Sequence, residues 1–212
     1  MEDIFDLAVS NKERVFVRTG LSLETEVAAD IVETFCEIPY IGSLIKLGRV
    51  VNSIQDIHFI HKLARFLEKE QDIPDKEKEE FLNSLSPKQR KKIYEYLTQY
   101  LLRAEDSAKA DIMGYIYKER VYGRIDDEMF LRLCSIVDRA FIFDLKSLPK
   151  YEKEDKESNG DDSITVNALI NLGLIENEID TGAWNNRTII ELNEVGQTLH
   201  RVLTQNKWYE NE

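Results

Sequence analysis

Apolar residues recur at helical spacing along most of the chain. Val27, Ile31 and Phe35 follow one another at intervals of four, which places them on one face of a helix. Residues 53–70 carry a wider apolar stripe, so this helix is predicted to lie at the centre of the core. The stripe consists of Ile54, Ile57, Phe59, Ile60, Leu63, Ala64, Phe66 and Leu67.

Local start and stop signals divide the next part of the chain into further helices. Residues 77–85 form a short helix, and Ser86 with Pro87 is a cap followed by a first-turn proline that begins another. Gly123 is expected to end a helix over 106–122 in the left-handed conformation. In the helix that begins at Pro87, the side chains expected to point inward are Ile93, Tyr96, Leu97, Tyr100 and Leu101.

The longest helix is predicted to begin at Asp126 or Asp127 and to stop at Pro149. Residues 150–162 then contain one aromatic and no aliphatic residue, which is typical of a solvated acidic linker or loop. The long helix has a continuous apolar seam at spacings of four and three, formed by Phe130, Cys134, Val137, Phe141, Leu145 and Leu148.

After the linker the pattern changes to the order helix, hairpin, helix, which is that of a winged-helix module. The predicted elements are a helix over 164–172 ending at Gly173, strands over 174–179 and 188–192 around a turn at 181–186, and a helix capped by Asn193. The expected fold is therefore mainly α, with a multi-helix bundle followed by a small winged-helix-like α/β module. The expected domains are a bundle over 1–149, an acidic linker or loop over 150–162 and the module over 163–212.

Composition supports the helical prediction and narrows the choice of partners. The 212 residues include 9 Gly and 4 Pro, too few for a loop-rich β fold. The net charge of −12 repels nucleic acid, although residues 41–149 carry 19 bases against 18 acids. The acidic N-terminus lacks the features of a secretory signal. Cys36 and Cys134 are interpreted as reduced thiols in the core. Together these two features predict a cytoplasmic location.

The most apolar stretch, residues 38–51, is open to two interpretations. It is shorter than the ~20 apolar residues of a spanning helix. It is either a buried helix or a helix that lies in a membrane interface after release from the bundle, which would make the protein peripheral to the membrane on activation. The residues expected to contact a membrane or partner are Ile41, Leu44, Ile45, Lys46, Leu47 and Arg49.

Few residues suggest chemistry. His58 and His61 stand three apart on a helix, a spacing that suits two metal ligands, but no third ligand is near in sequence, and His200 stands alone. No phosphate-binding loop, nucleophile elbow or zinc quartet is present in the sequence. We therefore expect no enzymatic activity, no cofactor and no metal. A basic cluster at a helix start can contact an anionic partner, and it is formed by Lys88, Arg90, Lys91 and Lys92.

The winged-helix interpretation raises the question of DNA binding. A recognition helix uses cationic or amide side chains on bases and phosphates. Residues 163–172 contain no Lys or Arg, and Arg187 is the nearest cation of the hairpin. A protein contact is therefore the preferred role for this module.

The chain resembles the abortive-infection alpha-like group of bacterial proteins, helical proteins linked to phage defence. The resemblance lies in hydrophobic and turn residues of 38–42 with 59–67, of 123–145, and of 169–175 with 192–196. It implies no catalytic motif and no named functional residue, and the acidic first 37 residues lie outside it. The first hypothesis is a non-enzymatic interaction or adaptor protein in phage defence, which binds a protein partner or itself. The alternatives are a membrane-acting effector that uses 38–51 and a winged-helix transcriptional regulator.

Overall fold

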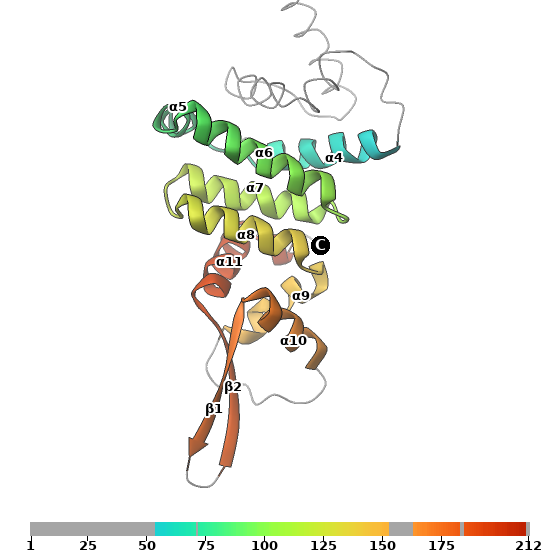
Figure 1. The fold of residues 1–212 in the computed structure, drawn as a ribbon, viewed down its shortest axis with the longest axis vertical. Helices are drawn as coiled ribbons and strands as arrows, with labels where there is room; N and C mark the ends of the chain where they lie inside the picture. The colour runs from blue at the N-terminus through green and yellow to red at the C-terminus, as the bar shows by residue number, and fades with distance from the viewer. Residues whose placement is uncertain (1–53, 71, 153–162, 183–184, 211–212) are drawn as a thin grey trace, which may run out of the picture. The chain divides into compact units, whose positions relative to one another are not determined.

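The structure, a computed structural model, describes residues 54–70, 72–152, 163–182 and 185–210 (Figure 1). Within these residues the chain forms eight α-helices, two 3-10 helices and one two-stranded antiparallel sheet, so the mainly helical fold class is confirmed. The chain divides into two compact units, Met1–Arg124 and Ile125–Glu212.

The described part of the first unit consists of four helices, α4 (Ile54–Glu68), α5 (Asp75–Ser84), α6 (Pro87–Arg103) and α7 (Ala108–Val121). α7 contacts each of the other three. Eleven of its fourteen residues are buried, so its apolar side chains are not confined to one face. Gly114 allows α7 to approach α4 closely, because a Cβ there would lie 2.9 Å from the carbonyl oxygen of Phe66.

Local signals for the helix ends are confirmed in the first unit. The Ser86 side chain accepts a hydrogen bond from the Gln89 N–H, and the Gln89 side chain bonds back to Ser86, which completes a capping box before Pro87. Phe81, Leu82 and Leu85 are buried, as expected for the short helix. Gly123 has φ +67° directly after α7, the left-handed conformation that glycine adopts without strain.

The inner face of α6 differs from the prediction at one residue. Tyr96, expected to point inward, is 37% exposed, whereas Tyr94 is 1% exposed. With 3.6 residues per turn, Tyr94 lies about 60° from Leu97 around the helix, whereas Tyr96 lies about 100° away on the other side. Because Leu97 is fully buried at the middle of the inner face, the wider angle carries Tyr96 to the boundary with solvent.

The second unit begins with three short helices where one long helix was predicted. α8 (Asp127–Arg139), capped by Asp126, is followed by α9 (Ile142–Lys146) and the 3-10 helix η1 (Leu148–Tyr151). Pro149 therefore lies inside η1 and does not end a long helix.

The break falls at Ala140 and Phe141, whose backbones are extended, with ψ of 147° and 132°. The predicted seam fails at the second of them, because Phe141 is 63% exposed while Leu145 and Leu148 are buried. Spacings of four and three are the same for one helix and for two helices with a break between them, so periodicity alone could not reveal it.

The C-terminal part of the second unit contains the predicted order of helix, hairpin and helix. Its elements are α10 (Ser163–Leu172), β1 (Ile175–Gly182), β2 (Asn185–Leu192), α11 (Glu194–Gln205) and the 3-10 helix η3 (Trp208–Glu210). Gly173 has φ +72° at the end of α10, and the Asn193 side chain caps α11 by accepting from the Gly196 N–H, both as expected.

The strands extend further than their apolar residues indicated. Pairing continues to Gly182 opposite Asn185, so most of the predicted turn over 181–186 belongs to the ladder. The reason is that a ladder requires only backbone N–H and C=O groups, whereas the sequence signal was based on apolar side chains.

The C-terminal elements pack against helices that precede residue 150, and the predicted division into domains over 1–149, 150–162 and 163–212 stays a prediction. α11 contacts α8, β2 and η1, and β2 contacts η1. Helices that were expected to belong to the bundle over 1–149 therefore form one compact unit with the C-terminal elements. The structure describes residues 150–152 of the predicted linker, which belong to η1 and the residue after it.

Candidate interaction surfaces

The residues expected to contact a membrane or partner lie wholly outside the described part of the chain. Residues 38–51, with Ile41 to Arg49, are among those not described, as are Cys36 and the predicted helix that carries Val27, Ile31 and Phe35. Their role in a membrane or partner contact stays a prediction. In the parts of the chain that the structure describes, no helix combines the length and apolar character needed to cross a membrane.

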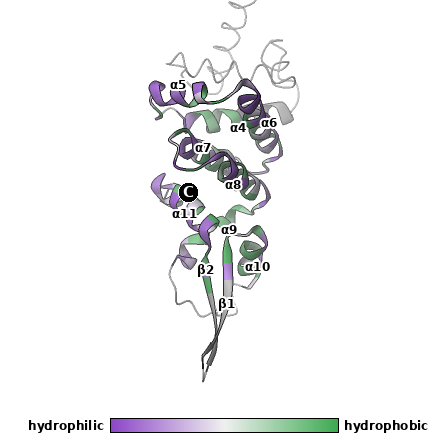
Figure 2. Cartoon of the chain, turned by 60° about the vertical axis from the view of Figure 1, so that its left-hand side comes forward, coloured by the Kyte–Doolittle hydropathy of each residue, from purple (hydrophilic) through white to green (hydrophobic). Residues whose placement is uncertain are grey.

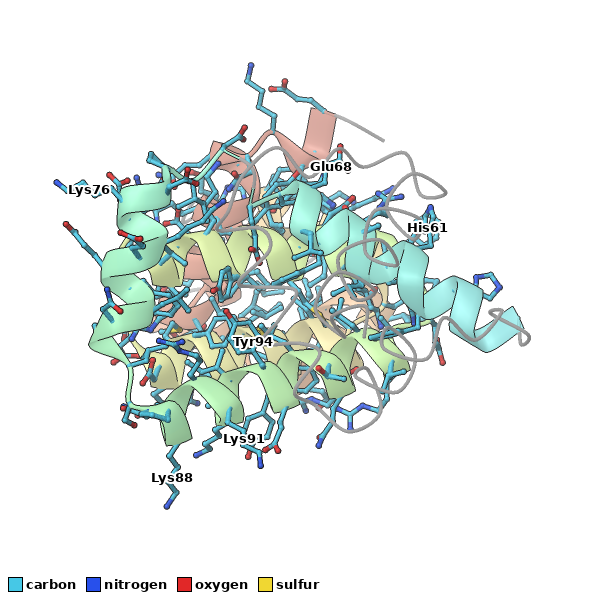
Figure 3. The ribbon with its side chains drawn as sticks, turned by 90° about the horizontal axis from the view of Figure 1, so that it is seen from above. His61, Glu68, Lys76, Lys88, Lys91 and Tyr94 are labelled. Atoms are coloured by element: carbon cyan, nitrogen blue, oxygen red, sulfur yellow. The ribbon has the colours of Figure 1, made fainter. Side chains whose placement is uncertain are left out.

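The histidine pair is at the surface of α4. His58 and His61 are both exposed, and Figure 3 shows His61 on this helix. Within the described residues, no group of three or more His, Cys, Asp or Glu side chains is arranged to hold a metal ion.

The third histidine, His200, lies in α11 and is buried against polar side chains of its own unit. Its Nδ1 lies 3.0 Å from the hydroxyl of Tyr209, and its Nε2 lies 3.7 Å from a carboxylate oxygen of Glu152. Burial raises the pKa of the Tyr209 hydroxyl, and the Glu152 charge raises it further. A phenol held in its neutral form is suited to a structural hydrogen bond, so we read this set as a link between α11, η3 and the end of η1.

Cys134 is also a structural group. It is fully buried in α8, and burial raises the pKa of its thiol. Because the thiolate is the reactive form, the thiol is chemically inert at neutral pH. Its place in the apolar seam of α8 agrees with the sequence prediction of a core thiol.

The basic cluster at the start of α6 separates into two groups. Lys88, Lys91 and Lys92 are exposed, and Figure 3 shows Lys88 and Lys91 pointing away from the helices. Arg90 instead donates from Nη2 to the carbonyl oxygen of Leu82 at 2.7 Å, which links α6 to the end of α5. Three lysines therefore form the surface cluster, and the arginine has a role in the fold.

A row of rings and cations continues from these lysines along α6. The Lys92 Nζ lies 5.8 Å from the centroid of the Tyr96 ring, and the Tyr96 and Tyr100 rings are stacked with centroids 6.3 Å apart. The guanidinium carbon of Arg103 lies 5.3 Å from the Tyr100 ring. Tyr96 was predicted to be inward, so the sequence reasoning missed this row. The repeated spacing of three and four from Lys92 to Arg103 is the signal that could have found it.

The second unit has an aromatic pair at its surface. Phe141 and Phe143 are 63% and 68% exposed, and their ring centroids are 5.2 Å apart. The Lys146 Nζ lies 5.4 Å from the Phe143 ring. Phe143 lies two residues after Phe141, and residues two apart lie on different faces of a helix. At least one of the two phenylalanines could therefore have been expected at the surface.

Several charged groups of the first unit are buried. The Asp111 carboxylate in α7 accepts hydrogen bonds from the Arg65 guanidinium of α4 through both oxygens, one of them at 3.0 Å. The Lys62 Nζ donates to the carbonyl oxygen of Ala104 at 2.8 Å. These contacts join α4 to α7 and to the end of α6, so they stabilise the helix arrangement.

Glu70 is the exception, because neither of its carboxylate oxygens has a hydrogen-bond partner among the residues that the structure describes. Glu70 follows α4 and is 2% exposed. Burial raises the pKa of its carboxyl to about 8, although the nearby charge of Lys78 lowers that pKa in part. Nearby, the hydroxyls of Tyr94 and Tyr117 lie 3.2 Å apart, and the Glu70 charge contributes to raising the pKa of Tyr117 after burial. At neutral pH Glu70 is therefore mainly protonated.

Comparison with known protein families, with curated proteins and with solved structures found no match to this chain.

Proposed function

We propose that the protein is a non-enzymatic helical adaptor, and that the Phe141–Phe143 pair is a site at which it binds another protein. The observation that carries this proposal is the exposure of two neighbouring aromatic rings by about two thirds of their surface. The rings contact each other at a centroid distance of 5.2 Å. A phenylalanine moved from water into a packed interface gains roughly 1.5–3 kcal/mol.

The neighbouring residues support an interface at this pair. Ile142 and Leu145 are buried, so α9 is anchored and presents the aromatic residues on a fixed support. Aromatic residues that are held rigidly contribute strongly to protein–protein binding because little side-chain entropy is lost on contact. Lys146 over the Phe143 ring adds a polar rim of the kind that surrounds such contacts.

The winged-helix-like order of α10, β1, β2 and α11 is part of the same proposal. α10 contains no charged residue, and its exposed positions include Ile164 at 85% and the amides Asn167 and Asn171. Phosphate contacts require cations or a concentration of donors, so this composition favours a protein contact over duplex DNA. A transcriptional role would require DNA binding with a steep salt dependence.

The resemblance to the abortive-infection alpha-like group supports phage defence as the cellular setting of the adaptor. The test is the efficiency of plating of a panel of phages on bacteria that carry or lack the gene. We expect reduced plaque formation with the wild-type gene and normal plaque formation with a Phe141→Ser/Phe143→Ser variant. Equal protection by both genes would show that phage defence does not depend on the aromatic pair.

The adaptor function is tested by replacing Phe143 with the photo-crosslinking amino acid benzoylphenylalanine in the native cells. Lys76, with 80% of its side chain exposed on α5, is the matched control position. Irradiation should give a discrete crosslinked species from position 143 and none from position 76. Purified protein irradiated alone shows whether that species is a second copy. The absence of a discrete product at 143, or the same products from both positions, would overturn the proposal.

A further inference from the structure

The outer face of α6 carries most of its exposed charge as cations. The cationic residues are Lys88, Lys91, Lys92 and Arg103, whereas Glu95 is the acid of this face and lies 3.9 Å from Lys91. The whole chain has a net charge of −12, so this helix has the opposite sign to its surroundings. Figure 2 colours both α5 and α6 as hydrophilic over much of their length, but the charges of α5 are mainly acidic.

The cations near the start of α6 are not explained by the stability of the helix. The positive end of the helix dipole lies at the N-terminus, where cationic side chains are slightly unfavourable. Lys88 and Lys91 nevertheless occupy the first two turns after the Ser86 cap. A function in binding explains residues that the helix itself disfavours.

The same face also contains apolar surface. Tyr96 is 37% exposed and Leu102 is 40% exposed, and both lie on the solvent side of α6. Counted in steps of about 100°, the positions from Lys88 to Arg103 on this side fall within one arc of roughly 140°. Over that length the helix rises about 22 Å, which is the length of about four turns of a second helix.

The face is held rigidly from behind. Ile93, Leu97 and Leu101 are buried on the inner side, the capping box fixes the start, and the Lys62 Nζ donates to the carbonyl oxygens of Leu102 and Ala104 at the end. A pre-ordered surface loses little entropy when a partner binds.

We propose that the outer face of α6 binds an acidic amphipathic helix of a partner protein. Carboxylates of that helix would lie against Lys88, Lys91 and Lys92, and its apolar residues would pack on Tyr96 and Leu102. The arrangement fits a helix better than a nucleic acid strand, because Glu95 interrupts the cations and a convex helix offers no groove that follows a phosphate backbone. This inference rests on the proposed adaptor function and adds a second contact of stated chemistry.

The experiment selects partners from a displayed library of 20-residue helical peptides with randomised surface positions, using the full-length protein as bait. The expected result is enrichment of peptides with an acidic cluster and one or two apolar residues on the same face. Enrichment of neutral or basic peptides would overturn the proposal, as would no enrichment at all. One enriched peptide, fluorescently labelled, is then used to measure Kd by anisotropy.

The key variant is Lys88→Glu/Lys91→Glu/Lys92→Glu, which should fold because acidic residues suit the start of a helix. Binding should weaken by at least about tenfold in low salt, since three attractive surface pairs become repulsive. The matched control is Lys76→Glu/Arg132→Glu/Arg201→Glu, which changes the net charge equally at exposed positions of α5, α8 and α11. Equal weakening in both variants would show an effect of net charge alone and would overturn a site on α6.

A second pair of measurements tests the apolar part and the class of partner. Tyr96→Ala/Leu102→Ser should weaken binding at low and at high salt, because apolar contacts are not screened. A single-stranded 20-mer oligonucleotide is titrated in parallel, and tighter binding of it than of the peptide would overturn the assignment in favour of nucleic acid. Phe143 lies on another helix, so the two experiments test different sites. A failure of peptide binding to α6 would leave the crosslinking result unchanged, and a negative crosslinking result would not alter the peptide Kd.

Discussion

The two compact units treat charge and apolar surface in opposite ways. In the first unit the described residues include six buried charged side chains, namely Lys62, Glu70, Lys78, Lys109, Asp111 and Glu119. In the second unit the large apolar residues Phe141, Phe143 and Ile164 are between 63% and 85% exposed. Buried ion pairs fix a unique arrangement of helices at a cost in desolvation, whereas exposed aromatic residues are useful only when something covers them. The first unit therefore combines a defined internal geometry with a cationic outer face on α6, whereas the second unit exposes these large apolar side chains to solvent.

Tight packing elsewhere in the second unit would show that its exposed aromatic residues are not a sign of loose structure. The largest expected effect is for Gly196→Ala, because a Cβ there would lie 1.9 Å from the carbonyl oxygen of Leu174. The backbone must shift to accept it, so the free energy of unfolding should fall by about 3 kcal/mol or more. Urea denaturation measures it, with the exposed Thr204→Ala of the same helix as control. A loss no larger than that of the control would mean that α11 moves easily.

The partly buried ion pair between Arg65 and Asp111 tests the same comparison in the first unit. Asp111→Ala leaves Arg65 without its bidentate partner, and we expect a loss of about 3 kcal/mol in the free energy of unfolding. Glu128→Gln in α8 is the matched control, since it breaks an exposed pair with Arg132 and should cost less than about 1 kcal/mol. Similar losses from both variants, measured by urea denaturation, would remove the distinction between the units.

Glu70 predicts how stability depends on pH. Its pKa is 4.5 in the reference state and about 8 in the folded protein, where burial favours the protonated form. A raised folded pKa means that this stabilisation is present in full below about pH 4.5 and is lost as the pH rises through 8. Between pH 5 and 8 the wild type should therefore lose roughly 3–4 kcal/mol relative to Glu70→Gln, at about 1.4 kcal/mol for each pH unit.

The measurement is urea denaturation at several pH values for the wild type, Glu70→Gln and the control Glu80→Gln, whose side chain is 68% exposed. The control should follow the wild type throughout. If Glu70→Gln also follows it, the buried carboxyl does not titrate in this range, and the contrast between buried and exposed charge weakens.

The parts of this fold that the sequence revealed are those that depend on neighbouring residues. Caps at Ser86, Asp126 and Asn193 and the helix ends at Gly123 and Gly173 require only a short stretch of chain, and all five are confirmed. Contacts between distant residues could not be predicted in this way. Arg65 and Asp111 are 46 residues apart, and nothing in either segment indicates the other.

In the candidate surfaces, too, features that depend on neighbouring residues were predicted and those that depend on tertiary packing were not. Three lysines of the basic cluster were found because they are adjacent in sequence, but the role of Arg90 at the end of α5 depends on how two helices pack. The exposure of Phe141 was missed because the break after α8 preserves the spacing of the apolar seam. Periodicity assigns residues to a face, and only tertiary packing decides whether that face is covered.

The smallest expected effect concerns the aromatic pair itself. Phe143→Ser removes a ring that is 68% exposed, so the free energy of unfolding should change by no more than about 0.5 kcal/mol. Two residues further along α9, Leu145→Ala removes a fully buried side chain and should cost roughly 2–5 kcal/mol. Both are measured by urea denaturation on the purified chain. A large loss from Phe143→Ser would mean that the ring supports the fold of the second unit, and the contrast with the first unit would then need no binding partner to explain it.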